Sequence, residues 1–368
     1  MESRRKYKKS SVIKIAGAFI VWVIGSGFAT GQEILQFFTS YGYWSYGIIL
    51  VNMAGFLFLG RVLLKIGYDH RADDSFNHFK YFCGEKLGTF YTWLIPIILL
   101  SVMPVLISGA GATLNEYYGV KHWLGSAIMT GLVLIAYLIG FERLMKIVST
   151  LGSSIIVFIL VVGAISMIQN WGDFEDAAGY EELLGASQAS PHWFFSAILY
   201  LSLIFISGST YFSKIGMTAK KRQEAIYGAS IGSVAVILTI AIINTAMILS
   251  AKQIATLSIP VLYLAKSISR VLGSVFSIFL ILGMFSSCSA MMWTVCNRFS
   301  FGGKRGNQLF AVLVAVFVFV MGLLPFSDLV ATLYPLVGYA GLVFLLCVLV
   351  KTFQSGYEKF RRKKQADS

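Results

Sequence analysis

The chain has 368 residues, of which 57% are hydrophobic and 13% are charged, and only six are prolines. A water-soluble domain of this length does not need so much apolar sequence, so the composition excludes an ordinary globular protein and predicts that lipid surrounds most of the chain. The net charge of +13 would suit a nucleic-acid-binding protein. However, the basic residues cluster between apolar stretches, as in membrane proteins, so we expect the lipid bilayer as a partner and no nucleic acid.

Long apolar stretches separated by short polar segments recur along the whole sequence. A bilayer core of roughly 30 Å requires about 20 apolar residues for each helical crossing, and the stretches are of this length. They are continuous, without the alternating ten-residue pattern of barrel strands, so we predict an all-α integral membrane protein. The ten predicted spans are residues 12–37, 42–66, 87–115, 121–140, 144–168, 192–217, 223–249, 268–297, 307–324 and 328–352.

The basic residues also indicate the orientation in the membrane. If the N-terminus is cytoplasmic and the chain crosses ten times, the outer segments hold only four of the 30 Lys and Arg residues, namely Lys121, Lys252, Lys266 and Arg270. Cytoplasmic segments of membrane proteins carry an excess of Lys and Arg. We therefore expect a multi-pass protein with both termini in the cytoplasm.

The first span contains a glycine-rich break. It reads Gly25-Ser26-Gly27-Phe28-Ala29-Thr30-Gly31, and each of its three glycines lowers helix stability by up to roughly 1 kcal/mol. Thr30 and Glu33 then form the Thr-x-x-Glu pattern of a capping box, which begins a new helix. We predict two half-helices, 12–24 and 31–38, joined by an unwound linker.

The sixth span has a similar interruption at Ser207-Gly208-Ser209-Thr210. Two breaks five spans apart fit two five-helix repeats of opposite orientation, with a binding site between them near the middle of the bilayer. The alternative is that these glycines allow close packing of unbroken helices. If both helices are broken, the predicted substrate-binding residues are Gly25, Ser26, Gly27, Ala29, Thr30, Gly31, Ser207, Gly208, Ser209 and Thr210.

Unwound backbone determines what such a site binds. It frees N–H groups at the start of each second half-helix and C=O groups at the end of each first half-helix, and both need partners inside a membrane. A carboxylate suits the N–H end, whereas an ammonium group or a small cation suits the C=O end. The pattern therefore favours a zwitterionic amino acid.

Residues 24–34, together with Gln36-Phe37-Phe38 and Tyr41-Gly42, resemble the opening of the YkvI-type bacterial membrane proteins of the amino acid–polyamine–organocation superfamily. This resemblance implies a bacterial cell membrane and a LeuT-like five-plus-five inverted repeat, with substrate bound by spans 1, 3, 6 and 8. The implied parts are a cytoplasmic tail (1–11), a first repeat (12–168), an extracellular loop (169–191), a second repeat (192–352) and a basic cytoplasmic tail (353–368).

The same resemblance implies a sodium ion between the carbonyls of Val21 and Ile24 and the hydroxyls of Ser286 and Ser287. The chain lacks the asparagine that some sodium-coupled relatives carry in the first break and has Phe28 nearby, which argues against a second sodium site. No other cofactor is expected, so Na⁺ or H⁺ remains as the coupling ion.

Two further features have a structural and a functional interpretation. Glu33 is the one acid that we place inside the membrane, where a carboxylate costs about 2.5 to 3.5 kcal/mol on insertion scales. It is either a helix cap or a group that binds a proton or a substrate amine. Ser108 begins a run of small residues on the third span, and it either lines the pocket or permits close helix packing.

The function predicted from these patterns is secondary transport of a small organic solute, most simply an amino acid or a related amine, by alternating access. An enzyme is not expected, because the chain has no His-Glu-x-x-His motif and no pair of membrane carboxylates. The alternative is a receptor that uses a transporter fold to sense its ligand without moving it.

Overall fold

The computed structural model describes residues 7–73, 75–139, 142–174, 184–185, 187–299 and 303–366, and this part of the chain is helical, without strands. The helices of the first half are α1 (Lys9–Val23), α2 (Ser26–Ala29), α3 (Gln32–Phe37), η1 (Thr39–Tyr41), α4 (Trp44–Asp69), α5 (His78–Tyr118), α6 (His122–Ile139), α7 (Glu142–Gln169) and η2 (Trp171–Phe174). Those of the second half are α9 (Trp193–Met217), α10 (Arg222–Leu249), α11 (Ala251–Ile254), α12 (Pro260–Ile268), α13 (Arg270–Arg298), α14 (Lys304–Met321) and α15 (Phe326–Ala366).

A helix occupies each of the ten intervals predicted as spans, and the first of them is interrupted. Within the described residues, seven helices are long and apolar enough to cross a membrane: α4, α5, α6, α9, α10, α13 and α15. A multi-pass membrane protein is therefore confirmed, whereas the number of ten crossings stays a prediction. Part of the predicted outer loop, residues 175–183 and 186, lies outside the described residues.

The predicted break in the first span is confirmed. Helix α1 ends at Val23, the single turn α2 follows, and α3 begins at Gln32. Two glycines shape the linker: Gly25 is extended, and Gly31 has φ 86°, a conformation that residues with a side chain rarely adopt. A Cβ at Gly31 would also lie 2.6 Å from Cγ2 of Val261 on α12.

The predicted break in the sixth span is wrong, because α9 runs without interruption from Trp193 to Met217. The hydroxyls of Ser207 and Ser209 donate to the carbonyls of Leu203 and Ile206 in the preceding turn, so these polar side chains are satisfied within the helix. The segment has a single glycine, Gly208, and a Cβ there would collide with Trp22 of α1. The close-packing alternative therefore holds for this span.

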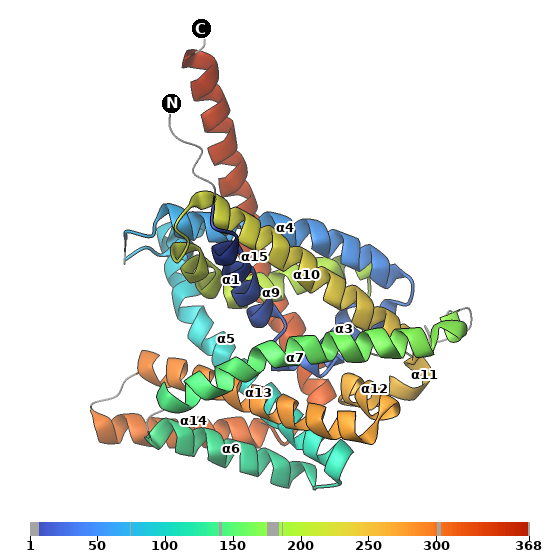
Figure 1. The fold of residues 1–368 in the computed structure, drawn as a ribbon. Coiled ribbons are helices and arrows are strands. Elements are labelled where there is room, and N and C mark those ends of the chain that lie inside the picture. The colour runs from blue at the N-terminus through green and yellow to red at the C-terminus, as the bar shows by residue number, and fades with distance from the viewer. Residues whose placement is uncertain are drawn as a thin grey trace.

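The helices form a bundle in which α9 packs against α1, α4 and α15 (Figure 1). It contacts α4 and α15 extensively, while α10 packs against both α1 and α4, and α5 packs against α13. Helix α15 projects beyond the bundle, at the top of Figure 1, as a helix to Ala366. The C-terminal basic segment is thus helical up to that residue.

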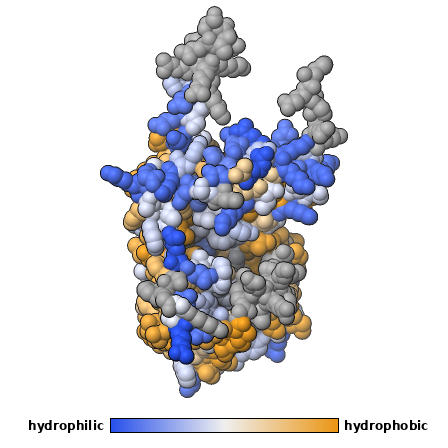
Figure 2. All heavy atoms as spheres, turned by 90° about the vertical axis from the view of Figure 1, so that its left-hand side faces the viewer, coloured by the Kyte–Doolittle hydropathy of each residue, from blue (hydrophilic) through white to orange (hydrophobic). Residues whose placement is uncertain are grey.

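The surface is divided between hydrophobic and hydrophilic side chains (Figure 2). In this view, which faces the left-hand end of Figure 1, hydrophilic residues gather over the upper and central parts, and hydrophobic residues border them. Large apolar side chains such as Ile13, Leu50 and Ile139 are exposed on the helices. Such an apolar surface is expected where helices face lipid hydrocarbon.

Candidate functional site

The broken first span brings its polar residues into the protein interior. Thr30 donates a hydrogen bond from Oγ1 to the carbonyl of Gly27 at 2.6 Å and accepts one from the N–H of Gln32 at 3.2 Å. Its own N–H donates to the carbonyl of Gly27. Because the side chain of Glu33 does not bond the N–H of Thr30, the predicted capping box is wrong, although Thr30 does stabilise the turn before α3.

Glu33 instead points into the protein without a bonding partner for one of its oxygens. The residue is 6% exposed, and Oε1 makes no hydrogen bond within the protein. The two ion pairs found among the described residues, Lys80–Glu85 and Arg222–Asp69, do not involve it. Since an unsatisfied buried polar group costs about 1–3 kcal/mol, this arrangement is a candidate for a binding role.

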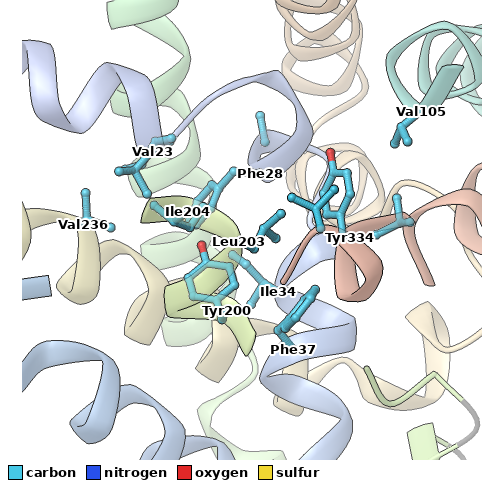
Figure 3. Close-up of a cluster of buried hydrophobic side chains, with 14 of the residues drawn as sticks. Val23, Phe28, Ile34, Phe37, Val105, Tyr200, Leu203, Ile204, Val236 and Tyr334 are labelled. Carbon is cyan, nitrogen blue, oxygen red and sulfur yellow. The ribbon is translucent and has the colours of Figure 1, made fainter. Parts of the chain in front are cut away.

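Two tyrosines from distant parts of the sequence face Glu33. The hydroxyl of Tyr200 on α9 lies next to the carboxyl, and it too makes no hydrogen bond. Tyr334 on α15 approaches from the other side: a Cβ placed on Gly27 would lie 2.7 Å from its hydroxyl and 3.9 Å from Oε2 of Glu33. Figure 3 shows Tyr200 and Tyr334 on either side of Ile34, with the Tyr334 hydroxyl pointing toward the linker that carries Phe28.

Helix α3 carries two further acceptor oxygens beside Glu33. The side chains of Gln32 and Gln36 are buried, and Oε1 of each has no partner within the protein. Gln36 is held in place because its Nε2 donates to the carbonyl of Ser327 at 3.0 Å. These unpartnered acceptors lie on the same short helix as Glu33. We term the following group the Glu33 site: Gly27, Gln32, Glu33, Gln36, Tyr200 and Tyr334.

Two segments contact the backbone of the first span around the Glu33 site. The N–H of Val261 at the start of α12 donates to the carbonyl of Thr30 at 3.1 Å, and Glu116 of α5 accepts hydrogen bonds from the N–H groups of Ser258 and Ile259 just before that helix. In addition, the N–H of Ala189 donates to the carbonyl of Gln36. A cavity of about 190 Å³ lies next to the second of these segments, lined by Ser40, Tyr41, Trp44, Gln188, Pro191, His192 and Trp193.

The predicted residues of the sixth span lie elsewhere. Gly208 packs against Trp22 near the end of α1, and Ser209 Oγ is 3.1 Å from Nε2 of the buried His78. These residues follow Tyr200 by about two helical turns, or roughly 10 Å. The predicted residues of this span therefore lie on the same helix as Tyr200, about two turns away from the residue that faces Glu33.

The structure also places the other residues that were predicted to bind the substrate or sodium. Ser108 donates to the carbonyl of Leu324 at 2.7 Å and lies 3.1 Å from Nε2 of His122, which favours its packing role. Ala29 is fully buried, and Gly25 is half-buried at the linker. The sodium site at Val21, Ile24, Ser286 and Ser287 stays a prediction; α13, which carries the two serines, packs against α2.

Sequence reasoning missed both tyrosines. Each lies within an apolar span, and a phenolic hydroxyl in such a position normally requires a hydrogen-bonding partner. This need for a partner could have marked Tyr200 and Tyr334 as candidate site residues. Nothing in the sequence indicated that both would face Glu33, because their spans are far apart in the chain.

Together, these helices define a multi-pass membrane protein with an interrupted first span and a buried polar site beside it. No family model matches the chain. It is 26% identical over 349 residues to the "Uncharacterized membrane protein YkvI" of Bacillus subtilis (strain 168), an alignment that covers 93% of this chain and 96% of YkvI. It is also 25% identical over 332 residues to the "Uncharacterized protein YyaD" of the same bacterium, covering 89% of this chain and 93% of YyaD. The predicted YkvI-type resemblance is thus confirmed.

The fold is also that of a known transporter. A crystal structure of a mutant of the Eremococcus coleocola manganese transporter aligns with a TM-score of 0.54 and covers 95% of this chain and 81% of that one. Sequence identity is 14%, so this likeness shows the fold alone. The chain therefore shares its fold with a transporter and its sequence similarity with a bacterial membrane protein.

Proposed function

We propose that the protein is a secondary active transporter of a small amine-bearing solute, an amino acid or a related amine, and that the ammonium group binds at Glu33. The observation that carries this proposal is the free Oε1 of Glu33, buried beside the break of the first span and facing the hydroxyl of Tyr200. A buried carboxylate needs a cationic or hydrogen-bonding partner, and no ion pair among the described residues involves Glu33.

The balance of donors and acceptors supports an ammonium ligand. The side chains of Gln32, Glu33 and Gln36 each present a free acceptor oxygen, and an ammonium group has three donors and no acceptor. Tyr200 can accept or donate with its hydroxyl. A ligand that is rich in donors therefore satisfies more of these groups than an anion does.

The contacts between helices support an inverted repeat behind this site. Helix α1 packs against α10 as α9 packs against α4, and α7 packs against α13 as α15 packs against α5. If the first five spans and the last five are equivalent, α1 corresponds to α9, α4 to α10, α5 to α13 and α7 to α15. Within each pair of contacts, one contact is then the counterpart of the other. Repeats of this kind underlie alternating access around a fixed central site.

The coupling ion that we propose is Na⁺ or H⁺, and Glu33 offers a route for the proton. One carboxyl can hold either a proton or a substrate ammonium, so the two ligands would compete for it. The Na⁺ alternative uses Val21, Ile24, Ser286 and Ser287. Uptake measured at fixed pH, with and without sodium, distinguishes the two.

Manganese is the second candidate substrate, because the structural neighbour is a manganese transporter. Within the described residues, however, no group of three or more His, Cys, Asp or Glu side chains is placed to hold a metal ion. First-row divalent metals are normally held by such ligands. The Glu33 site, with one carboxyl, suits an organic ammonium better.

A thermal-shift screen of the purified protein tests the substrate class. The compounds are the common L-amino acids, the amines obtained by removing their carboxyl groups, the acids obtained by removing their amino groups, and manganese chloride. We expect amine-bearing compounds to raise the melting temperature, since a ligand that binds only the folded state stabilises it. Stabilisation by manganese or by the deaminated acids, with no response to amines, would overturn the proposal.

A further inference from the structure

A second cavity lies on the side of the molecule, between α4 and α10. It has a volume of about 430 Å³ and is lined by Ala54, Leu57, Phe58, Arg61, Val62, Lys65 and Ile226. All but Ile226 lie on one face of α4, because positions 54, 57, 58, 61, 62 and 65 follow the i, i+3, i+4, i+7, i+8, i+11 spacing of a helix face. This cavity, termed the α4 groove, is separate from the Glu33 site.

The α4 groove faces the lipid. Ala54 and Arg61 are exposed, and Leu50, one turn before Ala54 on the same face, is 72% exposed. One side of the groove is bordered by Phe58, whose ring stacks on that of Phe353 of α15 at 6.5 Å between centroids. The groove therefore opens on a surface where acyl chains of the bilayer would lie.

The depth of the two basic residues matches that of a lipid headgroup. Trp44 begins α4, and Arg61 follows about 25 Å further along the helix axis at roughly 1.5 Å per residue. Trp residues favour the membrane interfaces, so Trp44 marks one of them. Because the hydrocarbon core is roughly 30 Å thick, Arg61 and Lys65 reach the opposite interface. The apolar lining from Ala54 to Phe58 lies at the depth of the acyl chains.

Arg61 brings a positive charge to the rim of the groove. The Nε of Arg61 donates to Oγ of Ser230 at 2.7 Å, a contact that orients the guanidinium without neutralising it. Asp69, the acid at the end of the same helix, is paired with Arg222 at 3.1 Å. Two cations at the rim of an apolar groove match the phosphate and the acyl chain of an anionic phospholipid.

We infer that the α4 groove binds an anionic phospholipid from the surrounding leaflet, with its phosphate at Arg61 and Lys65 and an acyl chain along Leu57 and Phe58. Arginine suits this role because its planar donor group bonds phosphate oxygens in pairs. The site is independent of the substrate site and does not rest on the proposed function.

Native mass spectrometry of the detergent-purified protein tests this inference. The probes are phosphatidylglycerol, phosphatidylcholine with the same acyl chains, glycerol phosphate and inorganic phosphate. We expect saturable binding of phosphatidylglycerol, weaker binding of phosphatidylcholine and no retained binding of the two soluble phosphates. Retention of the soluble phosphates as strongly as phosphatidylglycerol, or equal binding of both phospholipids, would overturn the inference.

Two variants locate the bound lipid. The double variant Arg61→Gln and Lys65→Gln should bind phosphatidylglycerol on the order of thirtyfold more weakly, the loss expected for two basic groups at a membrane surface. Ala54→Phe keeps both charges and fills the apolar part, so it should also weaken binding. The matched control, Lys86→Gln with Arg305→Gln, removes two exposed cations outside the groove and should bind as the wild type does. If the control loses as much affinity as the groove variants, the binding is general surface attraction and the inference fails.

Discussion

Replacing Glu33 by Gln isolates the charge of the one carboxyl in the proposed substrate site. Gln has nearly the same size, and its amide can still approach the hydroxyl of Tyr200. Because Oε1 of Glu33 has no partner within the protein, the change breaks no hydrogen bond at that atom. We therefore expect the free energy of unfolding to change by less than about 1 kcal/mol, or to increase, since a buried charge is removed.

The main expected effect of the Glu33→Gln substitution is a lower affinity for the amine ligand. A hydrogen bond to a charged group contributes about 1.5–3 kcal/mol, so the Glu33→Gln variant should bind an amine ligand roughly tenfold to 150-fold more weakly. The deaminated analogue of the same ligand should bind the variant and the wild type equally. Isothermal titration calorimetry on both proteins with both ligands measures these four affinities. An amine affinity that the substitution leaves unchanged would refute the proposed role of Glu33.

The same variant also tests proton coupling. If Glu33 carries the coupling proton, uptake by the Gln variant should lose its dependence on pH, whereas the wild type should retain it. If Glu33 binds only the substrate ammonium, both proteins should show the same pH profile at saturating substrate. Uptake measured between pH 5 and pH 8 separates the two roles.

Three further predictions concern packing, stability and topology. Gly27→Ala should cost about 1–3 kcal/mol of stability and weaken ligand binding, because its Cβ would crowd the buried hydroxyl of Tyr334. The control Gly17→Ala, which has open space around it, should be neutral or stabilising in thermal unfolding. Glu224→Gln should lower the free energy of unfolding by about 1–3 kcal/mol without changing ligand affinity, because this buried carboxyl accepts three structural hydrogen bonds; unchanged unfolding in urea would contradict this. In a cysteine-free background, a cysteine at Ser187 should react with an impermeant maleimide added to intact cells and one at Ser355 should not, and the opposite labelling would reverse the orientation.

The break in the first span could be predicted because its cause is local. Three glycines in seven residues weaken the helix whatever surrounds it, and Gly31 needs a left-handed conformation that few other residues tolerate. The observed ends at Val23 and Gln32 agree with the predicted half-helices to within one residue. Local backbone preference was sufficient in this segment.

The sixth span could not be predicted in the same way, because its outcome depends on tertiary packing. Gly208 is required by the indole of Trp22 on another helix, and the neighbouring serines bond to the preceding turn. The sequence pattern of a packing glycine and that of a helix break are alike. Only the position of α1 beside α9 distinguishes them.

The contacts of the Glu33 side chain could not be predicted from the sequence either. The Thr-x-x-Glu pattern predicted a cap, but the N–H of Thr30 is used by the carbonyl of Gly27. The carboxyl is thereby released toward Tyr200 and Tyr334, which come from α9 and α15. A local motif gave the right residue and the wrong contact, since the competing partners are remote in the chain.

Counterflow in proteoliposomes tests most directly whether the protein moves an amine through this site. Vesicles containing the purified protein are loaded with an unlabelled amine that stabilises it, and entry of the labelled compound is followed after dilution. We expect transient accumulation with the wild type and with Glu224→Gln, and its loss or a large reduction with Glu33→Gln at the same substrate concentration. Saturable binding of the amine by the wild type without any counterflow would contradict transport and identify a ligand-sensing receptor instead.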